Sequence, residues 1–217
     1  MNLFSNWQNQ LDILYKTYCK ICEPKEVTYK KDICATQTEI DELERKLSTS
    51  IPKSLKDTFL FFSKNISFDA YLPDELALPP ELKGIFCASF TVSIEEMILA
   101  EESRKSWVES GLDPSDDYDK IFYNKLGFMT VPNGDMIAFD LSDPKEDKRV
   151  VYLSHDGGDG HGVVLGESFE AYFSNLLLIG ACGNEDWQMM PFIDKTKGLC
   201  ATSKNAETYR NLIGLIW

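Results

Sequence analysis

FMTVPNGDMIAFDLSDPKEDKRVVYLSHDGGDGHGVVLGESFEAYF, residues 128–173, is the stretch that decides the fold. Two short runs of β-branched and aromatic residues, 128–131 and 136–140, flank Pro132-Asn133-Gly134-Asp135. A tight turn needs positive φ, which Gly and Asn adopt at little cost. Asn-Gly between two such runs therefore predicts a β-hairpin.

The same stretch continues with a third strand and a helix. Residues 149–153 predict the strand, residues 156–162 form a glycine-rich loop, and residues 163–165 add a short apolar run. Ser168 is placed to cap the helix and Gly180 to end it. The stretch thus predicts a small antiparallel meander with a helix packed on one face. The helix buries the residues at i, i+3, i+4, i+7 and i+8: Phe169, Tyr172, Phe173, Leu176 and Leu177.

Helices and further strands are predicted on both sides of this meander. Residues 5–22 carry an apolar stripe that begins at Trp7, so an amphipathic helix opens the chain. Capping boxes at residues 36–39 (TQTE) and 93–96 (SIEE) begin two more helices. The other expected elements are a helix after Pro52, strands at 66–71 and 86–92, a polar link at 24–33 and a last helix within 202–217.

These patterns predict an α+β fold. We expect a small, mostly antiparallel twisted sheet with helices packed on one face and added N- and C-terminal helices. No repeat or clear linker divides residues 1–217, so one domain is expected. The helix at 5–22 and a C-terminal extension at 180–217 are expected as additions to this domain.

The charge of the chain bears on its partners. There are 35 acidic and 22 basic residues, which gives a net charge of −13. This argues against nucleic acid and against anionic membranes as partners, because both are polyanions. A basic protein partner fits the charge; an acidic surface kept for solubility fits it equally well.

The sequence also bears on cellular location. No apolar run approaches the ~18 residues that a membrane-spanning helix needs. Residues 1–5 lack the basic and apolar regions of a signal peptide, so we predict a cytoplasmic protein. Its six cysteines are then expected to be reduced thiols.

One loop carries metal-ligand chemistry. His155, Asp156, Asp159 and His161 lie within seven residues and include both histidines of the chain. A catalytic metal usually gathers its ligands from separate rigid elements, which a single loop does not supply. The glycines of this loop also lack the spacing of a phosphate or dinucleotide cradle. We therefore expect no enzyme, metal or cofactor, and keep a metal-dependent hydrolase that uses residues 155–161 as a remaining alternative.

The order of these motifs resembles the SUKH superfamily, which contains fungal cell-wall-assembly (glucan synthesis) regulators and many bacterial immunity proteins. The resemblance rests on the hairpin, the Val-Val-Tyr strand, the glycine-rich loop and the Leu-Gly-x-Ser-Phe-x-x-Tyr-Phe helix, and upstream on the acidic helix followed by Ile51-Pro52. The resemblance covers about residues 36–178 and implies that these form the core of the domain. The helix before residue 24 and the tail after residue 180 depart from the minimal core of the family. At the matching positions the resemblance implies turn geometry and packing: Gly134, Asp135, Asp140, His155, Phe169 and Phe173.

The resemblance implies a non-catalytic immunity protein. Such a protein binds a toxin, often a nuclease encoded nearby, and covers its substrate site with a concave sheet surface and rim loops. A nuclease must be basic to hold phosphates, so an acidic partner gains steering and complementarity. The fungal branch implies the alternative of a regulatory scaffold in cell-wall or stress signalling.

Two loops and two aromatic residues are the candidate contact surface. For the acidic residues at 113–119 a solvated loop is the default interpretation, and a partner-facing patch is the alternative. Tyr71 and Trp107 are candidate anchors, because aromatic residues dominate interface energetics, and core packing is their alternative. The carboxylates and the histidine of the two loops are Asp113, Asp116, Asp117, Asp119, His155, Asp156 and Asp159.

Overall fold

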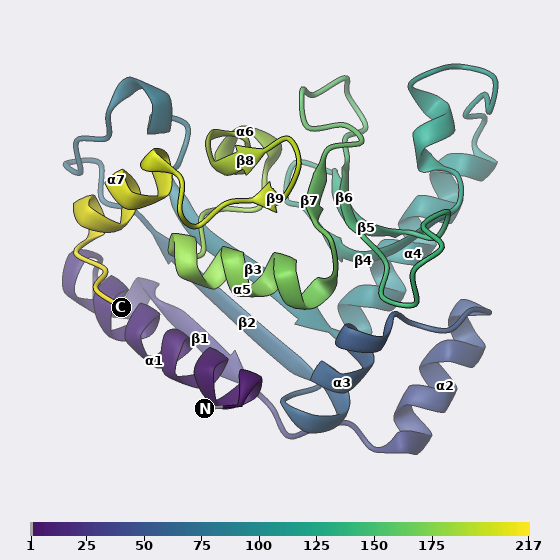
Figure 1. Cartoon of the computed structure of the whole chain (residues 1–217), viewed down its shortest axis with the longest axis horizontal. Helices are drawn as coiled ribbons and strands as arrows, with labels where there is room; N and C mark the ends of the chain where they lie inside the picture. Colours follow the sequence, from purple (N-terminus) through teal and green to yellow (C-terminus); the bar gives the residue numbers. More distant parts are fainter. Residues whose placement is uncertain (1) are drawn as a thin grey trace.

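The computed structural model describes residues 2–217 as an α+β fold with antiparallel sheets (Figure 1). The first sheet has the order β1-β2-β3 and the second the order β4-β5-β6-β7; β8 and β9 form a small hairpin. The α+β class expected from the sequence is confirmed. The strands are β1 (Thr28–Lys31), β2 (Asn65–Tyr71), β3 (Cys87–Ser93), β4 (Lys125–Thr130), β5 (Met136–Asp140), β6 (Val150–Leu153), β7 (Val164–Gly166), β8 (Ile193–Asp194) and β9 (Gly198–Leu199).

The helices begin at the capping residues that the sequence indicates. The side-chain oxygens of Thr36, Ser93 and Ser168 each accept a hydrogen bond from the backbone three residues later, and Gly180 ends the helix that begins at Ser168, at a φ of 121°. The α-helices are α1 (Leu3–Ile21), α2 (Gln37–Leu47), α3 (Lys53–Phe61), α4 (Ile94–Glu109), α5 (Phe169–Ile179), α6 (Asp186–Met189) and α7 (Lys204–Ile213).

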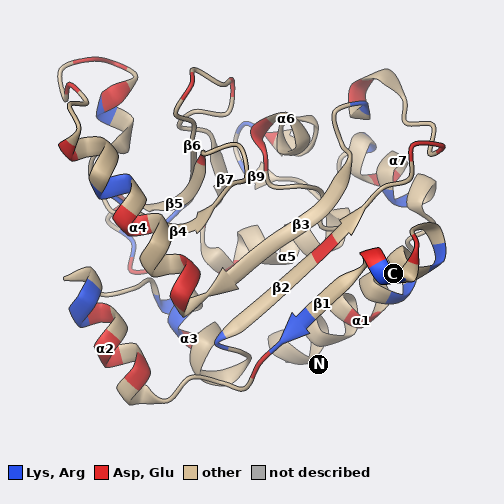
Figure 2. Ribbon diagram, turned by 180° about the vertical axis from the view of Figure 1, so that it is seen from behind, with Lys and Arg blue, Asp and Glu red and all other residues tan. Residues whose placement is uncertain are grey.

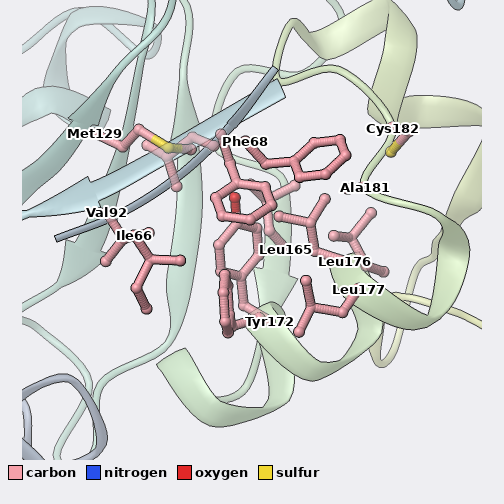
Figure 3. Packing of buried hydrophobic residues seen from close by; sticks show 14 of the residues in the cluster. Ile66, Phe68, Val92, Met129, Leu165, Tyr172, Leu176, Leu177, Ala181 and Cys182 are labelled. Carbon is pink, nitrogen blue, oxygen red and sulfur yellow. The ribbon is translucent and has the colours of Figure 1, made fainter. Parts of the chain in front are cut away.

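The main core lies between the first sheet and two helices. α1 and α5 cover one face of this sheet, and the other face is turned toward the viewer in Figure 2. Phe68 of β2 packs into the same space as Tyr172 and Leu176 of α5 (Figure 3). On the uncovered face, small polar residues stand opposite one another, as in the pair Ser67 and Thr91. This alternation of apolar and polar residues gives the sheet one buried face and one solvent-exposed face.

The second sheet is covered on both faces, which differs from the single sheet with helices on one face that we expected. One face joins the main core through Phe128, which contacts Phe169 and Tyr172 of α5. The other face packs against α4 and the segment after it, around Phe122. α4 approaches closely because Gly127 has no side chain: a Cβ there would lie 2.8 Å from the backbone of Ala100. The apolar residues of these strands occupy both faces, so two layers of cover are needed.

Two local expectations were wrong. Residues 28–31, expected to be part of a polar link, form edge strand β1, because their backbone pairs with β2 while their polar side chains stay in water. Only one of the two hydrogen bonds of the second capping box forms. Ser93 caps α4, but the Glu96 carboxylate accepts hydrogen bonds from Thr130 of β4 and not from the backbone N–H of Ser93.

Two further expectations concern the whole chain. No helix within residues 2–217 is long and apolar enough to cross a membrane. All six cysteines are free thiols.

The added terminal helices pack on the core at buried contacts. Trp7 of α1 is fully buried, donates a hydrogen bond to Ser174 Oγ (2.8 Å) and meets the ring of Phe173 at 4.9 Å. The Tyr18 hydroxyl lies 3.0 Å from that of Tyr209 in α7 and donates to the carbonyl of Gly180. Both terminal helices therefore share buried contacts with α5 and the residue that ends it, and one domain over residues 1–217 stays a prediction.

We predict that Trp7→Ala lowers the free energy of unfolding by about 3–5 kcal/mol, the usual range for truncating a buried aromatic residue. Unfolding of both variant and wild type should stay a single transition, seen together by circular dichroism and by tryptophan fluorescence. Tyr15→Ala, on the more exposed side of the same helix, is the control and should cost far less. A separate early transition of α1 would contradict the single domain.

Candidate protein-binding surface

Three segments form one edge of the molecule, which we call the rim. They are the acidic loop (residues 113–119) after α4, the glycine-rich loop (residues 156–162) between β6 and β7, and residues 184–191 around α6. Figures 1 and 2 show the three segments along the same edge from opposite sides. The two loops predicted to form the contact surface are therefore neighbours, and the α6 segment lies on the other side of the glycine-rich loop.

A buried carboxylate at the hairpin turn organises the rim. Asp135 Oδ1 accepts hydrogen bonds from the backbone N–H of His155 (2.8 Å) and from its ring Nδ1 (2.7 Å). Asp135 Oδ2 accepts from the Tyr152 hydroxyl and from Asn133 Nδ2, both at 2.8 Å. Burial by itself would raise the pKa of Asp135, but the hydrogen bonds from His155, Tyr152 and Asn133 outweigh it and hold the pKa below its usual value.

Tyr152 extends this network to α6. Its hydroxyl accepts a hydrogen bond from the backbone N–H of Asp186 (3.1 Å), while the Asp186 carboxylate accepts one from the N–H of Gly160 (3.0 Å). Asp186 sits so close that a Cβ at Gly158 or Gly160 would lie 2.5 Å from it. The glycines of the loop thus serve close packing against α6 rather than a phosphate.

His161 fixes the glycine-rich loop to the acidic loop. Its Nδ1 accepts a hydrogen bond from the backbone N–H of Ser154 (3.0 Å), so Nε2 carries the hydrogen and donates it to the carbonyl of Tyr118 (3.0 Å). The rings of His161 and Tyr118 stack at 3.8 Å. Burial lowers the pKa of His161, in keeping with this neutral tautomer.

The hydrogen bonds of His161 and Asp135 argue against the alternative of a metal-dependent hydrolase. Both ring nitrogens of His161 bond to the protein, so the loop cannot offer two imidazoles to one ion. Within residues 2–217, one group of three possible ligands comes within 4.8 Å, namely Asp135, His155 and Asp156. Both oxygens of Asp135 already accept hydrogen bonds from the chain, and an ion would have to replace them.

Three carboxylates of the acidic loop accept hydrogen bonds within the loop, and a fourth faces solvent. Asp113 accepts from Ser115, and Asp116 accepts from the backbone N–H groups of Tyr118 and Asp119. Asp119 accepts in turn from the N–H of Asp113. These three residues shape the loop. The side chain of Asp117 is 95 % exposed and pairs with Lys120, so it points toward solvent.

The other predicted residues fall in two places. Trp107 of α4 stacks on His155 with the ring centres 5.8 Å apart, and Asp156 and Asp159 are exposed on the glycine-rich loop. Tyr71 lies apart from them, at the end of β2, where it is 62 % exposed.

Residues of the α6 segment belong to the rim but were not predicted. Trp187 is 46 % exposed and, with Asp186, lines a broad hollow beside Asp156 and Asp159. Glu185 comes before it in the chain and lines a second hollow beside Tyr71. The only sequence signal was Trp187 among polar neighbours at 183–188, which does not reveal a contact with a loop about thirty residues earlier.

We predict that Asp135→Asn destabilises the protein by about 2–3 kcal/mol at pH 7, the value of one or two hydrogen bonds to a charged group. Because folding lowers the pKa of Asp135, its contribution is present above the unfolded pKa of ~3.9 and is lost as the pH falls through the folded value. Urea unfolding of both proteins between pH 7 and pH 3 should show the gap shrinking in acid. A gap that is constant over this range, or no larger than that of the exposed control Asp41→Asn, would contradict the role of Asp135.

Comparison with known proteins places the chain in a family. The model of the SMI1 / KNR4 family (SUKH-1) matches residues 34–175, which include the hairpin turn, the acidic loop and the glycine-rich loop. No curated protein matches the chain. The match covers well over half of the 217 residues and confirms the resemblance inferred from the sequence. The protein belongs to the SMI1 / KNR4 family (SUKH-1).

Proposed function

We propose that this protein is an immunity protein that binds a secreted toxin one to one and covers the toxin's substrate site. The family includes toxin-immunity proteins and is generally non-catalytic. The observation that carries the proposal is the composition of the rim, where exposed carboxylates and aromatic rings stand on loops that a buried network holds in place. We place the protein in the cytoplasm of the cell that it protects.

The charge of the rim suggests the class of toxin. Asp117, Asp156 and Asp159 are exposed, and the whole chain carries a net charge of −13. A nuclease presents basic side chains where it holds phosphates, so a carboxylate-rich surface imitates its substrate and speeds encounter. A basic nuclease domain, encoded near this protein, is therefore the partner we propose.

The fixed geometry of the rim suits binding rather than catalysis. His161 is locked as a neutral tautomer in the protein, and the thiol of Cys182 is fully buried, where burial raises its pKa to well above the usual value. A nucleophilic cysteine needs the opposite shift and an open approach. A loop held in one conformation loses little entropy on binding, which favours affinity.

The first experiment is co-purification with the C-terminal domain of a large secreted protein encoded by the adjacent gene. We predict a one-to-one complex by size exclusion with light scattering, and loss of the nuclease activity of that domain at a one-to-one ratio. A complex that leaves the activity intact would point to the regulatory scaffold instead. The absence of any complex would contradict the pairing with the neighbouring gene.

Charge reversal tests the contribution of the rim. Asp117→Lys with Asp159→Lys should lower the association rate about tenfold or more at low salt and much less at 0.5 M salt, because salt screens exposed charges. These two positions are chosen because Asp113, Asp116 and Asp119 hold the loop together through their hydrogen bonds.

The matched control places the same change of charge elsewhere. Asp12→Lys with Glu42→Lys alters exposed residues of α1 and α2, at the edge of the molecule opposite the rim (Figure 1). This variant should slow association only slightly. Equal slowing by the two pairs would mean that net charge, and not the rim, steers the partner.

A further inference from the structure

A second hollow, beside the rim, lies where the uncovered face of the first sheet meets the α6 segment. It has a volume of about 90 Å³. Asp69 and Tyr71 of β2 stand on this face opposite Ser89 and Cys87 of β3, and Glu185 closes the hollow from the α6 segment. A single antiparallel backbone bridge between Ala88 and Cys182 places the residues just before the α6 segment alongside β3.

One carboxylate oxygen of Glu185 has no hydrogen-bond partner among residues 2–217. The residue is only 8 % exposed, and this oxygen, Oε2, is buried. A buried carboxylate oxygen without a partner costs about 1–3 kcal/mol or more in stability. Burial, with Asp135 and Asp186 nearby, raises the pKa of Glu185, which is the shift that a bound cation would reverse.

The surroundings of Glu185 are acidic and aromatic. Asp69 also lines the hollow, burial raises its pKa too, and the lining includes no Lys or Arg. Two exposed aromatic residues are also part of the lining, Tyr71 at 62 % exposed and Phe86 at 46 % exposed. Carboxylates and exposed aromatic rings in one lining are the groups that recognise an organic cation.

We propose that this hollow binds an arginine side chain of the protein partner, with Asp69 and Glu185 pairing with the guanidinium and Tyr71 and Phe86 packing on its planar faces. The volume corresponds to about three water molecules at ~30 Å³ each, room for the four heavy atoms of a guanidinium head. Arginine fits better than lysine, because its guanidinium is planar, pairs with two carboxylates at once and stacks on aromatic rings. The choice of a protein partner rests on the proposed function.

The test uses a small probe and the full-length protein. We would titrate ¹⁵N-labelled protein with Nα-acetyl-arginine amide and follow the backbone amides by NMR. Saturable shifts at Ala70, Tyr71, Cys87 and Ser89, with a dissociation constant in the millimolar range, are expected. The uncharged isostere Nα-acetyl-citrulline amide should give no saturable shift at these amides, and Nα-acetyl-lysine amide should bind more weakly. Shifts that are equal for arginine and citrulline, or that centre elsewhere, would overturn the proposal.

Glu185→Gln gives a signature that a merely structural residue would not show. It removes a buried charge, one oxygen of which has no partner among residues 2–217, so the melting temperature should rise or stay unchanged while the affinity for the arginine probe falls about fivefold or more. Unchanged affinity would overturn the site. Should this variant fail to fold, Asp69→Asn is the second variant and should weaken the probe similarly. Glu81→Gln, an exposed residue of the 3₁₀ turn before β3, is the matched control and should bind like the wild type.

The arginine titration and the toxin experiment test different proposals, and a negative result in one does not decide the other. Arginine binding in the hollow without a toxin complex would remove the immunity proposal but keep a surface for a basic partner. A toxin complex whose affinity is unaffected by Glu185→Gln, together with no probe binding, would keep the immunity proposal and remove the hollow.

Discussion

The buried carboxylate of Asp135 is the constraint on which the rest of the rim depends. It sits in the turn of the β4–β5 hairpin and binds the backbone and ring of His155, the hydroxyl of Tyr152 and the amide of Asn133. Tyr152 passes the connection on to Asp186. The hairpin turn, strand β6 and the residue after Ser154 thus share one charged acceptor, and α6 is connected to it through Tyr152. Because a buried charge is costly unless it is fully hydrogen-bonded, these segments are stable only in this mutual arrangement.

The carboxylates of this acidic protein therefore fall into two groups. One group accepts hydrogen bonds from the chain and builds the surface: Asp113, Asp116, Asp119, Asp135 and Asp186. Asp117 and Glu185 are bonded less completely: Asp117 is open to solvent, and one oxygen of Glu185 is buried without a hydrogen-bond partner among residues 2–217. The net charge cannot separate the two groups, because each carboxylate counts the same. Position and hydrogen bonding decide which ones are available to a partner.

Much of the fold could be predicted because its signals are local. The period of α5, its cap Ser168 and its stop Gly180, and the Asn-Gly turn each depend on neighbours in sequence. Strand β1 was missed because an edge strand carries polar side chains and pairs through its backbone, which leaves no apolar pattern. The α6 segment was missed as part of the rim for a different reason: its place depends on contacts such as Gly160 with Asp186, which no spacing reveals.

The rim is built from two parts of the chain, one that the family model matches and one that lies outside the match. The match over residues 34–175 includes the hairpin, the acidic loop and the glycine-rich loop, whereas Glu185, Asp186 and Trp187 lie beyond it. Yet Asp186 packs against the glycines of the matched loop, and Glu185 closes the hollow formed by β2 and β3. Any partner that covers the edge must then touch both parts at once. A substitution in the unmatched segment can alter the surface offered by the matched core without disturbing the hydrogen bonds of Asp135 to His155 and Asn133 that hold its loops in place.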